Sequence, residues 1–280
     1  MKYKNPTGPA LAKISKFEYP PVLFRFPALI HAIYQFNFLL QLRKWHVLHA
    51  IKHMLRSATN PGTWIDIGCG EGQYLIPISK AFPAWKTIGI DNNTSNIQFL
   101  RKVAPANTSL ILSDIGTSAD QNKADIITCV GVLQYIANDD AALQNIASML
   151  QPNGKFLLYS PVNGRLHLSL YKYLLNRYEH YETINDRKRI YQEDALMNKL
   201  IRAGFRIENI RFTYGYCGRI SHEIQGIFIL SITSAPLPIR LMASILFVPV
   251  MPLSLLLMLI DYCIKHRSGN GVLLTATINS

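Results

Sequence analysis

Cysteine and acidic residues are both scarce in this chain of 280 residues. The four cysteines, Cys69, Cys129, Cys217 and Cys263, lie far apart and form no C-x-x-C pair, so neither a zinc site nor a disulfide framework is expected. Reduced thiols in a cytosolic compartment are the simplest interpretation. The sequence also has no internal repeat, no low-complexity tract and no metal-ligand cluster, so we predict no metal.

The shortage of acidic residues leaves the chain strongly basic. Seventeen Asp and Glu stand against 29 Lys and Arg, for a net charge of +12. Residues 1–60 carry nine of the basic residues against Glu18 alone, whereas residues 61–160 are slightly acidic. A basic periphery suits either nucleic acid or anionic lipid, and charge alone does not choose between them.

A glycine-rich turn follows the first strong strand signal. The segment Trp64-Ile-Asp-Ile-Gly-Cys-Gly-Glu-Gly72 places apolar residues around Asp66 and then alternates three glycines with other residues. Glycine permits unusual backbone conformations and lets a ligand approach the chain closely. A strand, a glycine turn and a helix together are typical of a nucleotide-type pocket.

The pattern of this turn differs from the dinucleotide fingerprint G-x-G-x-x-G. Here it is D-x-G-x-G-x-G, and an acid at Asp66 would repel a diphosphate but suits a cationic, amino-acid-like ligand. The segment resembles motif I of the class I S-adenosylmethionine-dependent methyltransferases. The alternative is a tight turn in another α/β protein.

Later landmarks follow in the order of that family. Segments 86–91, 110–114 and 124–130 each read as a strand, and the first two end in Asp91 and Asp114. The resemblance implies that Asp91 accepts the ribose hydroxyls, that residue 114 meets the adenine amino group, and that 131–135 lines the sulfonium side. The implied cofactor is S-adenosyl-L-methionine, and the implied binding residues are Asp66, Gly68, Cys69, Gly70, Gly72, Asp91, Asn92, Asp114, Ile115, Val130, Gly131 and Gln134.

Strands alternate with helix signals, which predicts a doubly wound, mostly parallel α/β sheet. We expect helices over 44–55, 71–82, 93–103, 138–150 and 192–203, with Pro77 kinking the second of these. Further strands are expected over 155–160, 205–213 and 271–278. The resemblance implies seven strands in a Rossmann-like methyltransferase fold, with the last two pairing antiparallel at the end of the sheet.

An apolar segment separates those last two strands. The chain turns apolar at Ile224, and Leu241–Ile260 holds twenty residues without a charge. Such a run is long enough to cross a bilayer, although a buried helix pair is the alternative. Because the family topology returns both ends to one side, a single crossing is excluded. A hairpin beside the pocket mouth could cross twice or dip in and return. The limb 227–235 is short, and Pro249 and Pro252 interrupt the longer limb, so we favour a re-entrant or interfacial hairpin over a double span.

These signals divide the chain into four parts. Residues 1–56 form a basic helical cap with an amphipathic segment over 26–42, and 57–223 form the cofactor-binding core. Residues 161–190, rich in Tyr and Arg, are the expected substrate lid. Residues 224–268 form the apolar hairpin, and 269–280 the last strand. Candidates for a base that deprotonates the acceptor are His167, His180, His222 and Tyr135.

The combined hypothesis is a methyltransferase acting on a hydrophobic small-molecule or lipid-like acceptor at the cytoplasmic face of a membrane, with no nucleic acid expected. Two alternatives stay open. One is an RNA or protein methyltransferase that uses the basic flanks, and the other is a non-catalytic membrane-associated binding module.

Overall fold

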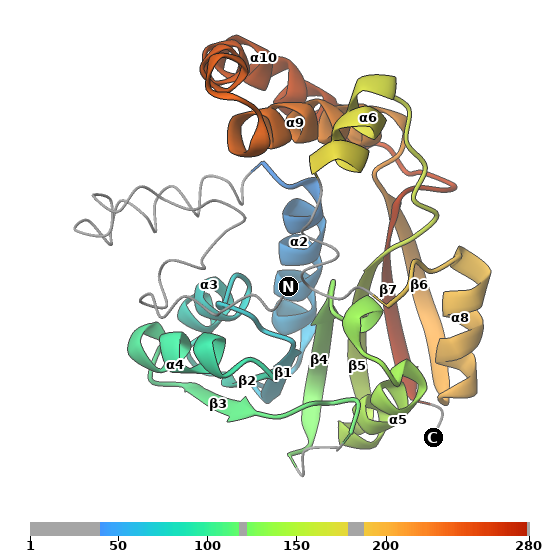
Figure 1. Cartoon of the computed structure of the whole chain (residues 1–280). Helices are drawn as coiled ribbons and strands as arrows, with labels where there is room; N and C mark the ends of the chain where they lie inside the picture. Colours follow the sequence, from blue (N-terminus) through green and yellow to red (C-terminus); the bar gives the residue numbers. More distant parts are fainter. Residues whose placement is uncertain (1–39, 118–121, 179–187, 279–280) are drawn as a thin grey trace.

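A computed structural model of the chain describes residues 40–117, 122–178 and 188–278 (Figure 1). At its centre lies a seven-stranded sheet of order β3-β2-β1-β4-β5-β7-β6. Strands β1 to β5 pair in parallel, and β7 pairs antiparallel with both β5 and β6, which confirms the expected fold class. The strands are β1 (Thr63–Ile67), β2 (Lys86–Asp91), β3 (Thr108–Leu112), β4 (Ala124–Val130), β5 (Leu150–Pro161), β6 (Phe205–Thr213) and β7 (Gly271–Ile278).

Helices cover both faces of this sheet, as a doubly wound fold requires. One apolar cluster joins Trp64 of β1 to α2 (Leu42–Ser57), α3 (Leu75–Ala81) and α4 (Thr94–Val103). The other joins Ile65, the next residue of β1, to α5 (Asp139–Met149) and α8 (Glu193–Arg202). Successive residues of β1 therefore pack into the apolar clusters on opposite faces of the sheet, because side chains alternate across a sheet.

The helix after the glycine turn is shorter than predicted. It begins at Leu75 instead of Glu71 and ends at Ala81. Pro77 consequently lies in the first turn of α3, where a backbone N–H has no partner within the helix, so the physical reason for the predicted kink does not arise. By contrast, α4 begins at Thr94, within one residue of the expected start, because the Asn93 side chain accepts hydrogen bonds from the N–H groups of Ser95 and Asn96.

Two other strand boundaries also differ from the predictions. The third strand ends at Leu112, so Asp114 stands in the turn beyond it. The fifth strand begins at Leu150 instead of residue 155, so the turn-forming residues Pro152-Asn-Gly154 lie within it. Asn153 in that turn has a φ of 63°, a conformation that asparagine tolerates better than most residues.

The apolar insertion forms an antiparallel pair of helices, α9 (Tyr216–Ser234) and α10 (Leu237–Cys263). The first limb is therefore longer than predicted, since its helix begins at Tyr216. The prediction that Pro249 and Pro252 interrupt the second limb is wrong, because α10 is continuous through both. Packing along α9 offsets the two helical hydrogen bonds that the prolines remove.

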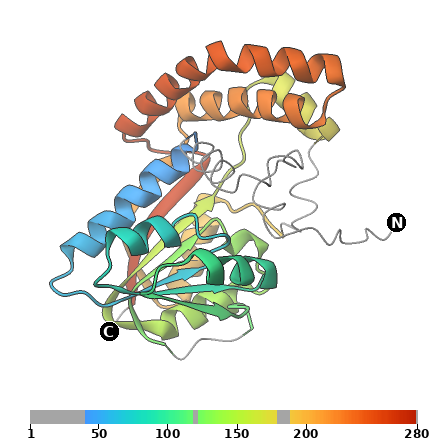
Figure 2. The same cartoon turned by 90° about the vertical axis from the view of Figure 1, so that its left-hand side faces the viewer.

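Both views place the hairpin as a layer over the edge of the sheet where the parallel strands end (Figures 1 and 2). Helix α9 lies nearer the sheet and α10 lies outermost. A short helix, α6 (Ser169–Tyr178) in the predicted lid, packs on α9, where Gly226 leaves room for the Tyr171 ring. The insertion thus sits on the same side as the glycine turn, as the topology predicted.

Several polar side chains of the hairpin are buried between its two helices or at its base. The hydroxyl groups of Ser221 and Ser254 lie 2.8 Å apart, and Gln225 Nε2 donates to Ser254 Oγ at 2.8 Å. At the base, buried Asp261 accepts the Gly218 N–H at 2.8 Å and lies 3.1 Å from His266 Nε2. On the exposed side of α10, the Ser244 hydroxyl donates to the Arg240 carbonyl at 2.9 Å, and most of the other side chains there are apolar.

Candidate cofactor and active site

The glycine turn adopts a conformation that favours glycine at three positions. Gly68, Gly70 and Gly72 have φ values of 66°, 55° and 81°. The N–H groups of Gly68 and Cys69 donate to the carbonyl of Ile90 at 2.7 and 3.1 Å, which joins the turn to the end of β2. A Cβ added at Gly70 would meet nothing within 4 Å, so open space lies over the turn at that residue.

Asp91 at the end of β2 is tied directly to this turn. Its Oδ2 accepts the N–H of Gly70 at 2.8 Å, and its Oδ1 accepts the N–H of Asn93 at 2.8 Å and the amide of Asn96 at 3.3 Å. A carboxylate oxygen accepts more than one hydrogen bond. Asp91 therefore organises the turn and keeps acceptor capacity for a ligand hydroxyl.

Asp66 lies beneath the same turn and is almost fully buried. Thr128 donates to its Oδ1 at 2.7 Å, and Trp64 Nε1 donates in turn to Thr128 Oγ1 at 3.1 Å. Burial raises the pKa of Asp66 to about 7. The hydrogen bond from Thr128 lowers this pKa, and the negative charge of Asp91 raises it further. Oδ2 of Asp66 has no partner among the described residues.

The segment after β4 supplies a second part of the predicted site. Gly131 has a φ of 70°, and its carbonyl accepts Nε2 of the buried Gln134 at 2.9 Å. Oε1 of Gln134 has no partner among the residues that the structure describes. Cys69, Val130 and Ile115 are also buried, so they can contribute apolar surface. Burial raises the pKa of the Cys69 thiol well above its ordinary value.

Two predicted contacts are less enclosed. Asp114 is exposed and its Oδ1 accepts the N–H of Gly116 at 2.9 Å, which is the ordinary role of an aspartate in a turn. Asn92 is also exposed. Both remain predictions as cofactor contacts.

The candidate bases are not gathered in one place. The His222 ring on α9 packs between Tyr171 and Tyr214, with centroids 6.1 and 5.5 Å away. His167 is exposed and packs against Tyr216 at 5.3 Å. Tyr135 lies in a single 3-10 turn, Leu133–Tyr135. His180 and most of the amphipathic segment 26–42 lie outside the described residues.

An arginine from α2 reaches the site, and sequence reasoning missed it. The Arg43 Nη1 lies 2.9 Å from where a Cβ on Gly131 would stand, and the guanidinium carbon lies 5.8 Å from the Tyr159 ring centroid. Arg43 precedes the glycine turn by more than 20 residues. No local pattern marks it, because only the packing of α2 on the sheet brings it to β4.

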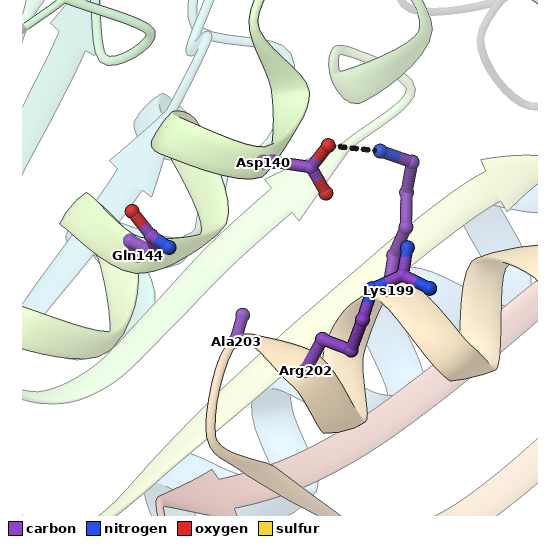
Figure 3. A pocket seen from close by; sticks show the side chains of 5 residues that line it. All are labelled: Asp140, Gln144, Lys199, Arg202 and Ala203. Carbon is purple, nitrogen blue, oxygen red and sulfur yellow. Dashed lines mark hydrogen bonds and ion pairs between the residues drawn. The ribbon is translucent and has the colours of Figure 1, made fainter.

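A surface hollow of about 300 Å³ lies elsewhere, between α5 and α8 (Figure 3). It is lined by Asp140, Gln144, Lys199, Arg202 and Ala203, and Lys199 Nζ bonds Asp140 Oδ2 at 2.7 Å. No residue of the predicted cofactor site lines this hollow. The glycine turn, and not this hollow, stays the predicted cofactor site.

This fold and turn define a Rossmann-like nucleotide-binding architecture. The family model described as a methyltransferase domain matches residues 59–221, which is more than half of the chain. The chain therefore belongs to the methyltransferase-domain family, and its cofactor is S-adenosyl-L-methionine.

Similar proteins agree with this membership. A protein of Invertebrate iridescent virus 6, provisionally named methyltransferase 235L, is 27% identical over 57% of this chain and 63% of its own length. Trans-aconitate 2-methyltransferase of Variovorax paradoxus is 30% identical over 35% of this chain and 38% of its own length. The chain thus spans less than two thirds of these curated relatives.

A solved structure shares the fold. The O-methyltransferase from the trans-AT PKS multienzyme of Brevibacillus brevis, in complex with S-adenosyl-L-homocysteine, is 16% identical with a TM-score of 0.55. The alignment covers 98% of this chain and 81% of that one.

The residues present fit the cofactor. Oδ2 of Asp66 is a buried acceptor that has no partner among the residues described, which suits a positively charged group. The open space over Gly70 admits a ligand against the backbone, and Asp91 retains acceptor capacity beside it.

Proposed function

We propose that this protein is an S-adenosylmethionine-dependent methyltransferase whose acceptor is a hydrophobic small molecule or lipid-like compound at a membrane surface. The observation that carries the membrane part is the outer face of α10, which we define as Leu241, Met242, Ile245, Leu246, Val248, Leu253, Leu256, Leu259 and Ile260. All nine side chains are exposed, and no charged residue lies between Leu241 and Ile260.

An exposed apolar stripe of this length favours contact with lipid. Helix α10 has 27 residues and is long and apolar enough to cross a membrane, yet little of its most apolar stretch is buried in the protein. Its length is about 40 Å, given a rise of 1.5 Å per residue. The polar groups of the hairpin are satisfied on the inner side, as lipid-facing helices require.

The two prolines favour an interfacial position over a deep one. Pro249 and Pro252 have no N–H, so the carbonyls of Ile245 and Val248 lose their helical donors. These are also the most exposed apolar residues of α10, at 72% and 67%. A carbonyl without a donor is costly in the bilayer core but accepts water at the interface. We therefore place α10 parallel to the membrane surface.

Basic residues at the ends of the hairpin support the cytoplasmic leaflet. Exposed Arg240 stands at the tip, and Lys265 and Arg267 follow the base. Lys and Arg beside an apolar segment are attracted to anionic headgroups.

The chemistry is a direct displacement. The bound sulfonium supplies the activated methyl group, so the chain's residues mainly align the acceptor and exclude water. Because the hairpin covers the sheet edge that carries the glycine turn, lipid bound by its outer face lies on the same side of the protein as the cofactor site. An acceptor would leave the membrane beside the hairpin to reach that site. His222, which faces Tyr214 at this edge, is the candidate that we favour for removing a proton from an oxygen or nitrogen acceptor. Plausible acceptors are a lipid, a prenylated quinone precursor, or a pigment or polyketide tail.

Flotation with vesicles tests the membrane part of this proposal. The intact protein is expected to float with vesicles containing anionic lipid and to remain bound when the salt concentration is raised. Salt screens the attraction between charges but does not weaken the burial of apolar side chains in lipid. Protein that stays at the bottom of the gradient, or that binds RNA in a strongly salt-dependent manner instead, would contradict it.

A further inference from the structure

Helix α6 of the predicted lid is fixed to the hairpin by a buried carboxylate. Glu223 on α9 is only 1% exposed, and its two oxygens accept the backbone N–H groups of His167 and Leu168 at 2.9 and 2.6 Å. These N–H groups stand at the N-terminal end of α6, where a helix has no internal partners for them and where a negative charge is favoured. Glu223 therefore holds the start of α6 against α9.

A close ring contact fixes the next turn of the same helix. Gly226 on α9 lies so near Tyr171 that an added Cβ would stand 2.3 Å from the ring. The buried Tyr171 ring also packs edge-on against the ring of His222, with centroids 6.1 Å apart. Because both anchors lie on α9, the lid helix and the hairpin form one packed unit.

An exposed stripe of α6 is apolar, aromatic and cationic. Leu170 and Tyr173 are 55% and 57% exposed, and Arg177 is exposed as well. Their spacing of three and four residues aligns these three side chains along the helix, and we call them the lid face. Residues 163–178 contain three Lys or Arg and no Asp or Glu. Amphipathic rings and long cationic side chains are favoured where a membrane meets water.

The position of α6 matches this preference. Both views place α6 beside α9 at about the same height, whereas α10 lies outermost (Figures 1 and 2). Packed helices lie about 8–10 Å apart, and the headgroup region on each side of a bilayer is roughly 5–8 Å thick. When α10 lies at the boundary between headgroups and acyl chains, side chains of α6 therefore stand at about the level of the headgroups.

We propose that α6 is a second membrane contact, whose lid face binds the headgroups of anionic lipid while the outer face of α10 lies against the acyl chains. The positive charge of α6 is complementary to such headgroups. The lid helix is then held between the bilayer and the sheet edge, so an acceptor that leaves the membrane passes α6 on its way to the cofactor site. The inference rests on the membrane contact proposed for α10.

Fluorescence quenching by brominated lipid tests this contact directly. Tyr173→Trp places an indole on the lid face, and its emission should be quenched by anionic vesicles whose acyl chains carry bromine close to the headgroup. Ile201→Trp is the matched control, because Ile201 is similarly exposed on α8, away from the hairpin. It should be quenched no more than the wild type, whose three tryptophans give the background. Absence of quenching at residue 173, in protein that floats with the same vesicles, would overturn the inference.

Charge reversal gives a second readout. A basic residue near an anionic membrane surface contributes about fivefold to binding. Arg177→Glu should therefore weaken binding to anionic vesicles about 25-fold and leave binding to neutral vesicles within about twofold. Arg101→Glu, which reverses an exposed arginine on α4, far from the hairpin, should change neither. Arg177→Gln, with a loss of about fivefold, replaces Arg177→Glu if that variant does not melt cooperatively.

Two results of the charge reversal would overturn the inference. One is an equal loss with Arg177→Glu and Arg101→Glu, because net charge alone would then explain it. The other is salt-dependent binding of RNA that Arg177→Glu abolishes, because the lid face would then belong to nucleic acid. Failure of the wild type to float with either kind of vesicle would instead remove the proposed membrane function itself.

Discussion

Replacing Ile245 and Val248 with glutamine is expected to release the protein from lipid vesicles while leaving it folded. Both side chains project from the outer face of α10 and are 72% and 67% exposed, so neither supports the core. Full burial of such a side chain contributes about 1.5–3 kcal/mol. Transferring roughly two thirds of each into lipid contributes about 3 kcal/mol for the pair, which corresponds to about a 150-fold change in partitioning.

The assay is co-sedimentation with vesicles of neutral phosphatidylcholine, which removes headgroup attraction and isolates the apolar contribution. Ile201→Gln is the matched control, because Ile201 is 59% exposed on α8, away from the hairpin (Figure 1). Thermal melts in the absence of lipid should be the same for the wild type and both variants. The assignment of the outer face to lipid would be refuted if the double variant sedimented with vesicles as well as the wild type does. It would also be refuted if Ile201→Gln reduced vesicle binding as much as the double variant does.

Two other predictions concern the cofactor site. Asp91→Ala should weaken S-adenosylhomocysteine binding at least a hundredfold in calorimetry while a cooperative melt is retained, because the substitution removes the acceptor for the Gly70 N–H as well as a ligand contact; unchanged affinity would remove Asp91 from the site. Because burial raises the pKa of Asp66 from 3.8 to about 7, the folded chain binds more protons than the unfolded chain between about pH 4 and 7, so the stability of the cofactor-free protein should fall as pH rises through this range. Asp66→Asn should flatten that slope in melts at several pH values, and an unchanged slope would show that another group titrates.

The sequence predicts β2, β4, β6 and β7 with the boundaries that the structure has. Strands β2, β4 and β7 are mainly apolar runs, whereas β6 alternates apolar with polar residues. The glycine turn and Asp91 were also predictable, since their residue types and spacing are themselves the signal. The hydrogen bond between Gly70 and Asp91 confirms that these two parts of the sequence meet.

The features that the sequence did not predict depend on contacts between distant elements. Helix α9 begins at Tyr216 because Asp261, 43 residues beyond Gly218, accepts the N–H of that glycine. Helix α10 passes through Pro249 because α9 supports it along its length. Arg43 joins the site only through the packing of α2, and nothing in its neighbourhood marks it in the sequence.

Transfer of a methyl label tests the central claim most directly. The detergent-purified protein would be incubated with methyl-labelled S-adenosylmethionine and a lysate of its own host, and the label would be followed into the organic extract, the RNA and the protein. We predict that label enters the organic extract with the wild type and not with Asp91→Ala. Label found only in RNA or in protein would contradict the hydrophobic acceptor.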